Sequence, residues 1–323
     1  MAKPESTADT DSVILIDGSS YVYRAYHALP PLTTSSGQPT GAVRGVTTMV
    51  MRILEDHPNS PIGMIFDAKG DTFRHEMYKE YKANRPPMPD DLRPQIQPIY
   101  DIVEALGVKI FVVDNVEADD VIAHITTLSH YDGWQKVIVS NDKDFYQLCD
   151  DETVVFRPVS KTVYNKKRIV EELGVHPRNM ALARALVGDA SDNLPGIKGV
   201  GLKTVAKNFE FLSEAKQYDL DELIDVCRDQ EKPKVSHTNI MAGRDIIAEN
   251  YDMMQLYNPT ISYTNKKSIE ELEGVIFGVS NLKELLEIIK IWNSIDLNEL
   301  QYTNHEIWSW PNINDIDPRK WNM

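Results

Sequence analysis

SVILID, residues 12–17, is a short apolar run that ends on an acid. Three later segments have the same form: IGMIFD at 62–67, KIFVVD at 109–114 and KVIVSND at 136–142. Amphipathic stretches such as 41–56 and 92–107 separate these runs. Apolar strands that alternate with helical patterns are typical of βαβ units. The sequence therefore predicts an α/β fold with a central, mostly parallel sheet flanked by helices.

The composition is that of a globular protein. Of the 323 residues, 42% are hydrophobic and 26% are charged, and no apolar run approaches the length of a membrane span. Residues 1–11 are small and polar, without the apolar segment of a signal peptide, so we expect a short disordered tail there. Two cysteines in no metal-binding spacing fit a reducing compartment. We expect a cytoplasmic monomer that has no membrane partner.

The charge is unevenly distributed along the chain. The net charge is -15, but residues 157–207 carry 10 Lys and Arg against 4 Asp and Glu. Residues 1–156 carry 13 against 24, and residues 208–323 carry 11 against 21. A basic segment in the middle of an acidic chain keeps nucleic acid open as a partner, although the overall charge argues against it.

Carboxylates follow several of the predicted strands. The set comprises Asp17, Asp67, Glu117, Asp119, Asp120, Asp142, Asp144, Asp189 and Asp192. Taken singly, each acid can be a helix cap, and VEADD at 116–120 reads most simply that way. However, ligands bind at the carboxyl ends of parallel strands, and so many acids at one edge require cations. Oxygen ligands without His or Cys indicate Mg²⁺ or Mn²⁺, and two such ions about 4 Å apart can clamp a phosphodiester for hydrolysis.

The segment GDTFRHEMYKEYKANRPPMPDD, residues 70–91, interleaves aromatic and cationic side chains. We predict a helix that Pro86 ends, with Arg74, Tyr78, Lys82 and Arg85 on one face. A solvated surface helix is the plainer alternative. Rings for stacking and cations for phosphates are nevertheless what single-stranded nucleic acid requires.

GIKGVGLKT, residues 196–204, is a glycine-rich turn between two helical patterns in the basic segment. It is not a nucleotide-binding P-loop, because Leu202 separates Gly201 from Lys203 and no strand precedes it. An ordinary turn is one alternative. A turn whose backbone N–H groups and lysines hold duplex phosphates is the other, and its place in the basic segment favours it. The candidate DNA-binding residues here are Gly196, Lys198, Gly199, Gly201, Lys203, Thr204 and Lys207.

Five of these segments together resemble the 5' nuclease domain of bacterial DNA polymerase I and its stand-alone bacterial and bacteriophage flap endonuclease relatives. The segments are IDGSSYVYRAYHALPPLT, FDAKGDTFRHEMYKEYKANRPPMPDDL, VEADDVIAH, SNDKDFYQL and GDASDNLPGIKGVGLKT. The resemblance implies a Mg²⁺-dependent enzyme, with Mn²⁺ able to substitute, that removes 5' flaps and RNA primers from branched DNA. The polymerase region of polymerase I is not in these 323 residues, so we expect either a stand-alone enzyme or an excised domain. The resemblance is loose beyond about residue 211.

The resemblance also assigns roles to residues. Asp17, Asp67, Glu117, Asp119 and Asp142 resemble the ligands of a first metal ion, and Asp144, Asp189 and Asp192 those of a second, with Asp120 able to serve either. Lys82 and Arg85 match arch cations that contact the scissile phosphate, and Tyr81 matches an arch aromatic that stacks on the displaced strand. Arg74 and Tyr78 would add DNA contacts. The glycine turn resembles a helix-hairpin-helix element that grips duplex DNA, with a K⁺ ion.

We therefore expect four parts: a disordered tail at 1–11, a nuclease core at 12–180 that includes an arch at 70–93, a helical duplex-binding region at 181–300 with its hairpin at 196–201, and a tail of unknown role at 301–323. Three other functions account for less of this sequence. A phosphatase of the haloacid dehalogenase type lacks support, because Ser19 stands where its second aspartate is needed. A ribonuclease sharing the acidic core would need neither arch nor hairpin, and a DNA-junction binding protein would not need every acid.

Overall fold

The computed structural model describes residues 11–273, so the tail expected at 301–323 and all but the last residue of the tail expected at 1–11 lie outside the described range. Its centre is a six-stranded sheet with the order β3-β2-β1-β4-β5-β6. The strands are β1 (Ser12–Asp17), β2 (Ile62–Phe66), β3 (Lys109–Val112), β4 (Gln135–Val139), β5 (Thr153–Arg157) and β6 (Thr162–Tyr164). All neighbours pair in parallel except β5 and β6. The predicted mostly parallel sheet is confirmed.

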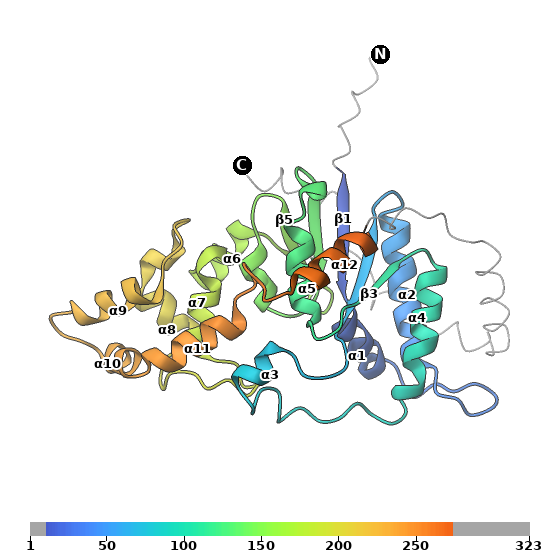
Figure 1. The fold of residues 1–323 in the computed structure, drawn as a ribbon, viewed down its shortest axis with the longest axis horizontal. Coiled ribbons are helices and arrows are strands. Elements are labelled where there is room, and N and C mark those ends of the chain that lie inside the picture. The colour runs from blue at the N-terminus through green and yellow to red at the C-terminus, as the bar shows by residue number, and fades with distance from the viewer. Residues whose placement is uncertain (1–10, 274–323) are drawn as a thin grey trace, which may run out of the picture.

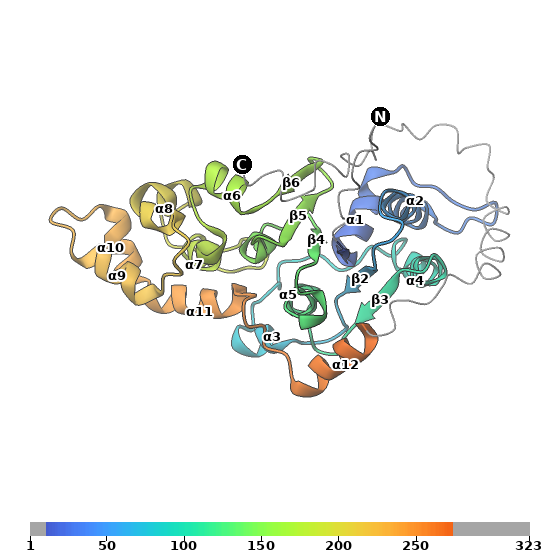
Figure 2. The same ribbon diagram turned by 90° about the horizontal axis from the view of Figure 1, so that it is seen from above.

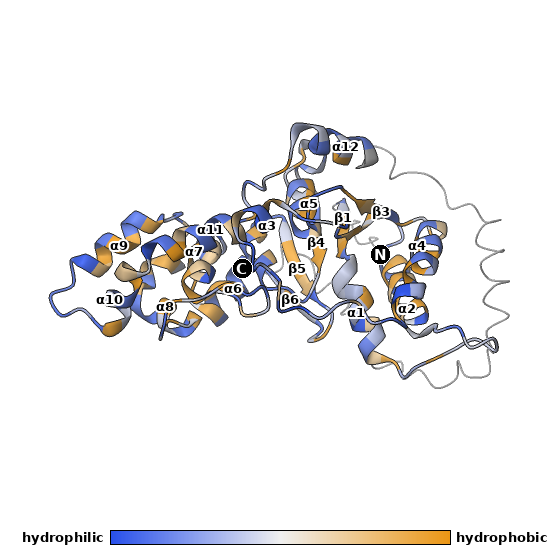
Figure 3. Cartoon of the chain, turned by 60° about the horizontal axis from the view of Figure 1, so that its bottom comes forward, coloured by the Kyte–Doolittle hydropathy of each residue, from blue (hydrophilic) through white to orange (hydrophobic). Residues whose placement is uncertain are grey.

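Helices cover both faces of this sheet (Figures 1 and 2). On one face lie α1 (Gly18–Ala28), α2 (Gly41–Asp56) and α4 (Ile96–Ala105), and on the other lies α5 (Ala118–Thr126). Successive strand residues point to opposite faces, so Ile14 and Ile16 pack on the first side and Val13 and Leu15 on the second. β2 is apolar along its whole length because both of its faces are buried. The apolar sides of α2 and α4 turn toward the sheet (Figure 3).

A helical region extends to one side of the sheet (Figure 1). It contains α6 (Lys166–Leu173), α7 (Pro177–Val187), α8 (Leu202–Asn208), α9 (Leu220–Arg228), α10 (Val235–Ala242) and α11 (Arg244–Met254). The chain then returns, and α12 (Tyr263–Glu273) packs against α5. Short 3-10 turns complete the described elements: η1 (Arg93–Gln95), η2 (Ser129–Tyr131), η3 (Asp144–Leu148) and η4 (Glu210–Ser213). The boundary expected after residue 180 falls inside α7. Among residues 11–273, none of the helices combines the length and the apolar character of a membrane span.

The long arch helix was wrong. Only α3 (Phe73–Met77) is helical, and Tyr78 leaves it with an extended backbone. The segment is held instead by tertiary contacts: the Lys82 N–H donates to the Asp192 carbonyl oxygen at 3.0 Å, and the Asn193 side chain donates to the Glu80 carbonyl oxygen at 2.8 Å. Lys82 has a φ of 55°, which a continuous helix excludes. Helical spacing therefore does not place the cations of this segment.

The glycine turn does lie between two helices, as predicted. It joins α7 to α8, and the chain begins it at Gly188, whose φ of 74° favours glycine. At Gly196 the backbone passes so close to α7 that a Cβ would stand 1.8 Å from the Val187 carbonyl oxygen. At Gly201, by contrast, a Cβ would meet nothing within 4 Å. A close backbone contact therefore requires glycine at 196, whereas no such contact requires it at 201.

This difference makes a matched pair of substitutions. We expect Gly196→Ala to lower the free energy of unfolding by about 2 kcal/mol or more, because the backbone must shift to admit the methyl group. Gly201→Ala should cost less than about 1 kcal/mol, the size of a changed helix N-cap. Urea denaturation followed by circular dichroism measures both, and equal losses would contradict the close approach at Gly196.

Candidate active site

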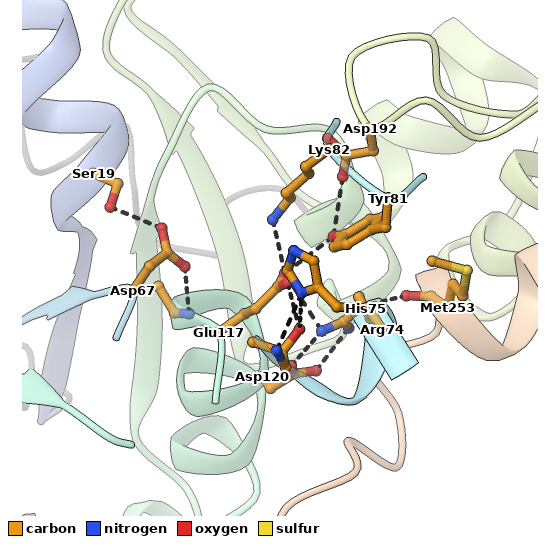
Figure 4. Close-up of polar contacts among 12 residues, drawn as sticks. Ser19, Asp67, Arg74, His75, Tyr81, Lys82, Glu117, Asp120, Asp192 and Met253 are labelled. Atoms are coloured by element: carbon orange, nitrogen blue, oxygen red, sulfur yellow. Dashed lines mark hydrogen bonds and ion pairs between the residues drawn. The ribbon is translucent and has the colours of Figure 1, made fainter. Parts of the chain in front are cut away.

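The carboxyl ends of β1 and β2 bring the first acids together. Asp17 ends β1, and its carboxylate accepts hydrogen bonds from Ser20 N at 3.0 Å and Ser140 Oγ at 2.7 Å. Asp67 follows β2 and accepts from Ser19 Oγ at 2.9 Å and from Ala118 N, the first residue of α5, at 3.0 Å (Figure 4). Parallel strands deliver both acids to the same edge, as predicted.

The end of β4 adds the next pair. Ser140, directly after this strand, receives a hydrogen bond from Asp142 N at 3.0 Å, and Asp142 in turn receives one from Asp144 N at 2.8 Å. Burial and then the charge of Asp142 raise the pKa of Asp144 to about 7. Ser140 thus links the acids after β1 and β4, a role that its place in the strand end gave no means to predict.

Five of the nine predicted acids are paired with cations of the chain. Lys82 Nζ lies 2.9 Å from Glu117, and Arg85 pairs with Asp192. Arg184 joins Asp144 at 2.7 Å and Asp189 at 2.5 Å, and Arg74 joins Asp120 at 2.5 Å. Sequence patterns had indicated Arg74, Lys82 and Arg85 as functional cations. No sequence pattern distinguished Arg184 on α7.

Four acids have no cation partner among the described residues: Asp17, Asp67, Asp119 and Asp142. They influence one another, because burial and then the charges of Asp142, Asp17 and Asp67 raise the pKa of Asp119 well above 3.8. Burial, with smaller contributions from the charges of Asp67 and Asp142, raises the pKa of Asp17 to about 7. Asp119 also accepts no hydrogen bond within residues 11–273. A cluster of oxygen donors short of positive charge fits a hard divalent cation.

The side chains are not yet arranged as a complete coordination shell. Within the described part of the chain, no three His, Cys, Asp or Glu residues stand together closely enough to hold a metal ion. Contacts of two arch residues, Tyr81 and Lys82, explain part of this arrangement of the acids. Tyr81 Oη donates to Glu117 at 3.1 Å and to Asp192 at 3.2 Å, and Lys82 holds Glu117 from the other side (Figure 4).

Two predicted DNA contacts are corrected by burial. Arg74 is 3% exposed and forms a two-point ion pair with Asp120, while its Nε donates to the Met253 carbonyl oxygen at 2.7 Å (Figure 4). The ring of Tyr81 is 5% exposed and packs with Leu194. The Arg74 guanidinium cannot reach a phosphate and the Tyr81 ring cannot stack on a base, because both lie inside the protein. Asp120, 1% exposed, is likewise held by Arg74 away from the sheet edge.

The end of α11 forms the back of the site, a role that no sequence pattern indicated. A small cavity of about 20 Å³ lies there, and it touches Glu117, Asp119, Asp144 and Asp192. Its apolar wall is made by Leu194, Met253, Met254 and Leu256. A space of this size and polarity is suited to a single water molecule. Arg74 and Met253, which are 179 positions apart in the sequence, therefore meet behind the acids.

The predicted hairpin residues lie in the helical region, beside the turn that carries Asp189 and Asp192. Lys198, Lys203 and Lys207 are exposed, as is Gly199, whose φ is 77°. Tyr78 is half-buried at the end of α3, and Thr204 is half-buried in α8. The three lysines are thus open to solvent, whereas the arch cations are tethered to the acids.

Residues 12–174 match the protein family described as "5'-3' exonuclease, N-terminal resolvase-like domain". The chain belongs to this 5'-3' exonuclease family. The 5'-3' exonuclease of Aquifex aeolicus is 39% identical over 193 residues, which are 60% of this chain and 67% of that protein. DNA polymerase I of Pseudomonas aeruginosa is 48% identical over 192 residues, 59% of this chain. The matched segment spans 21% of that polymerase.

Solved structures share the fold of this family member. The zinc-bound T5 5'-exonuclease superimposes with a TM-score of 0.65 at 18% identity, covering 84% of this chain and all of that one. A T5 5'-exonuclease carrying the mutation K83A gives a TM-score of 0.59 at 16% identity, covering 87% of this chain and 99% of that one. At these identities the likeness establishes the fold, and the chemistry rests on the side chains described above.

The unpaired acid Asp119 gives a stability prediction. Without divalent cations, Asp119→Asn should raise the free energy of unfolding at pH 8 by about 1 kcal/mol or more, since each pKa unit corresponds to about 1.4 kcal/mol. The raised pKa means that the folded state holds an extra proton between pH 3.8 and that pKa, so wild-type stability increases as pH falls and the gain shrinks by pH 5. Urea denaturation in EDTA at both pH values measures this. Asp114→Asn, an exposed acid after β3, is the control, and a destabilising Asp119→Asn would restore the helix-cap interpretation.

The buried pair of Arg74 and Asp120 gives another. Arg74→Ala should lower the free energy of unfolding by about 3–5 kcal/mol, because it leaves a carboxylate buried without its partner. Arg93→Ala, an exposed cation in the same segment, should change it by less than about 0.5 kcal/mol. A stable Arg74→Ala protein that had lost only DNA affinity would show that this arginine contacts DNA after all.

Proposed function

We propose that this chain is a structure-specific 5' nuclease, a flap endonuclease and 5' to 3' exonuclease that hydrolyses phosphodiester bonds during DNA replication and repair. One observation carries the proposal. Four carboxylates without a cation partner among the described residues, of which Asp17 is buried and Asp67 and Asp142 are exposed, lie near the arch cations Lys82 and Arg85. Bare carboxylates repel a phosphodiester, whereas carboxylates that hold divalent cations attract it. The membership in the 5'-3' exonuclease family supports the same reaction.

The acids fall into two groups, each of which would hold one metal ion. Asp17, Asp67, Asp119 and Asp142, joined by Glu117, would hold a first Mg²⁺ ion, and Asp144, Asp189 and Asp192 a second. Such ions supply an activated water and neutralise charge on the attacking and leaving oxygens. The serines that bind Asp17 and Asp67 fix the orientation of these two carboxylates. Asp120 is paired with Arg74, so we no longer propose it as a ligand.

The arch cations would act on the scissile phosphate. Lys82 and Arg85 are each tethered to an acid, Glu117 and Asp192, and Arg85 is about half-exposed, with 49% of its side chain accessible. If these acids held divalent cations, Lys82 and Arg85 would be less strongly paired and would be available to an incoming anion. A fixed positive charge next to the phosphate stabilises the charge that develops in the transition state. Tyr81 would position Glu117 against Asp192 instead of stacking on a base.

The partner would be branched DNA with a 5' single-stranded flap, or an RNA primer annealed to DNA. Exposed Lys198 and Lys203 near the N-terminus of α8, together with Lys207 in its last turn, would hold duplex phosphates without reading the bases. A K⁺ ion at this hairpin, Mn²⁺ in place of Mg²⁺ and a monomeric enzyme in the cytoplasm complete the proposal. T5 flap endonuclease has been crystallised with DNA and metal ions, which supports such a partner.

The deciding experiment compares substrates. An end-labelled 5'-flap DNA, a blunt duplex and an RNA primer on DNA are incubated with the protein over a range of Mg²⁺ concentrations, and the cut positions are mapped. We expect cleavage near the branch that requires Mg²⁺ and is far slower on the blunt duplex. Binding without cleavage would leave a junction-binding protein, and cleavage of RNA regardless of structure would indicate a ribonuclease.

Substitution of the acids tests the site itself. Asp142→Asn and Asp189→Asn should each lower the cleavage rate at least about 100-fold, the scale of losing one electrostatic group in the transition state. Binding of flap DNA in Ca²⁺, measured by fluorescence anisotropy, should change less than about threefold, because neither acid contacts the duplex. Asp114→Asn is the matched control and should cleave normally. Full activity of either variant would place the reaction elsewhere.

A further inference from the structure

Arg184 lies inside the second group of acids. It belongs to the last turn of α7, and its side chain is 17% exposed. Its Nε donates to Asp144 Oδ1 at 2.7 Å and its Nη2 donates to Asp189 Oδ2 at 2.5 Å. One guanidinium therefore bridges an acid from the sheet edge and an acid from the turn after α7.

The carboxylate oxygens of this group are almost fully occupied by the chain. Five of the six oxygens of Asp144, Asp189 and Asp192 accept a hydrogen bond within the described residues. Asp189 Oδ1 receives both Ser191 N at 2.7 Å and Ser191 Oγ at 2.6 Å, and its other oxygen receives Arg184. Asp119 in the first group, by contrast, receives none. A cation that binds at the second group therefore competes with donors of the chain for most of these oxygens.

Charge distinguishes the donor that competes with a divalent cation from the donor that does not. Ser191 is neutral, and its hydrogen bonds orient Asp189 whether or not a cation is bound. Arg184 is permanently positive, and a guanidinium within 3 Å of these oxygens repels a divalent ion that seeks the same oxygens. The backbone of α7 is fixed by its packing on η3 and α11, so only the arginine side chain is free to move.

We propose that Arg184 is a built-in counter-ion of the second acidic group. It holds Asp144 and Asp189 together when no divalent cation is present, and it competes with a divalent cation for their oxygens. The second site consequently fills only at a higher divalent concentration than the first. The inference rests on the proposed function, because it requires that these acids bind a divalent ion.

Arg184→Met tests the proposal, since it keeps the length of the side chain and removes its charge. Mn²⁺ binding to the full chain without DNA is measured from the electron paramagnetic resonance signal of free Mn²⁺, which gives both stoichiometry and affinity. We expect the weaker Mn²⁺ site to tighten at least tenfold, whereas the metal-free variant should unfold at a lower temperature. Arg178→Met is the matched control, because Arg178 lies on the same helix and its side chain donates to the Ala215 carbonyl oxygen at 3.4 Å, with no carboxylate partner among residues 11–273.

Two further variants separate charge from geometry. Arg184→Lys keeps the positive charge, so its Mn²⁺ affinity should stay within about threefold of wild type. In an Asp189→Asn background, Arg184→Met should tighten Mn²⁺ binding less than it does in the wild-type background, because one of the two contested carboxylates is gone. If Arg184→Met fails to fold, Arg184→Gln, which keeps a hydrogen-bond donor and removes the charge, takes its place with the same expected tightening.

Several results would overturn the inference. Unchanged or weaker Mn²⁺ binding by Arg184→Met would make this arginine a ligand-orienting residue instead of a competitor. Equal tightening by Arg184→Lys and Arg184→Met would show that geometry and not charge is responsible. If wild type binds Mn²⁺ and only these comparisons fail, the proposed nuclease function stands. If wild type and every variant bind no Mn²⁺, the proposed function fails and this inference falls with it.

Discussion

Two carboxylates about 4 Å apart repel by roughly 4 kcal/mol at an effective dielectric near 20, and this edge of the sheet gathers several of them. The chain offsets part of that repulsion itself. Lys82, Arg85 and Arg184 each neutralise acids in the site, and Arg74 neutralises Asp120 behind it. What stays uncompensated is the group around Asp119. The positions of the chain's own cations thus define where an added cation is needed most.

The same interactions tie together parts of the fold that are far apart in the sequence. Arg74 joins the start of the arch to α5 through Asp120 and to the end of α11 through the Met253 carbonyl oxygen. Lys82 and Asn193 join the arch to the turn that carries Asp192. The arch is therefore not an independent helix over the site but a segment shaped by contacts to both acidic groups. Its conformation and the charge state of those groups are physically linked.

Local pattern was sufficient for the regular elements and for most of the acids. The four runs that end on acids became parallel strands, because alternation of apolar strands with amphipathic helices leaves few other ways to bury both faces. The strands β5 and β6, which do not end on acids, were not among the predicted runs. In the arch, helical spacing misled, since Tyr81 is buried and the Lys82 backbone is held by Asp192. Burial of this kind depends on partners that sequence spacing does not contain.

The sequence by itself determined the parallel sheet, the acids at its carboxyl ends and the glycine turn in a basic segment. These follow from short-range periodicity and from the rule that parallel strands point their ends in one direction. Only the tertiary structure decided which acids are paired with cations, that Arg74 and Tyr81 face inward, and that Arg184 enters the second acidic group. Those outcomes depend on distances between residues many positions apart, and the charge of a side chain does not reveal which opposite charge it will meet.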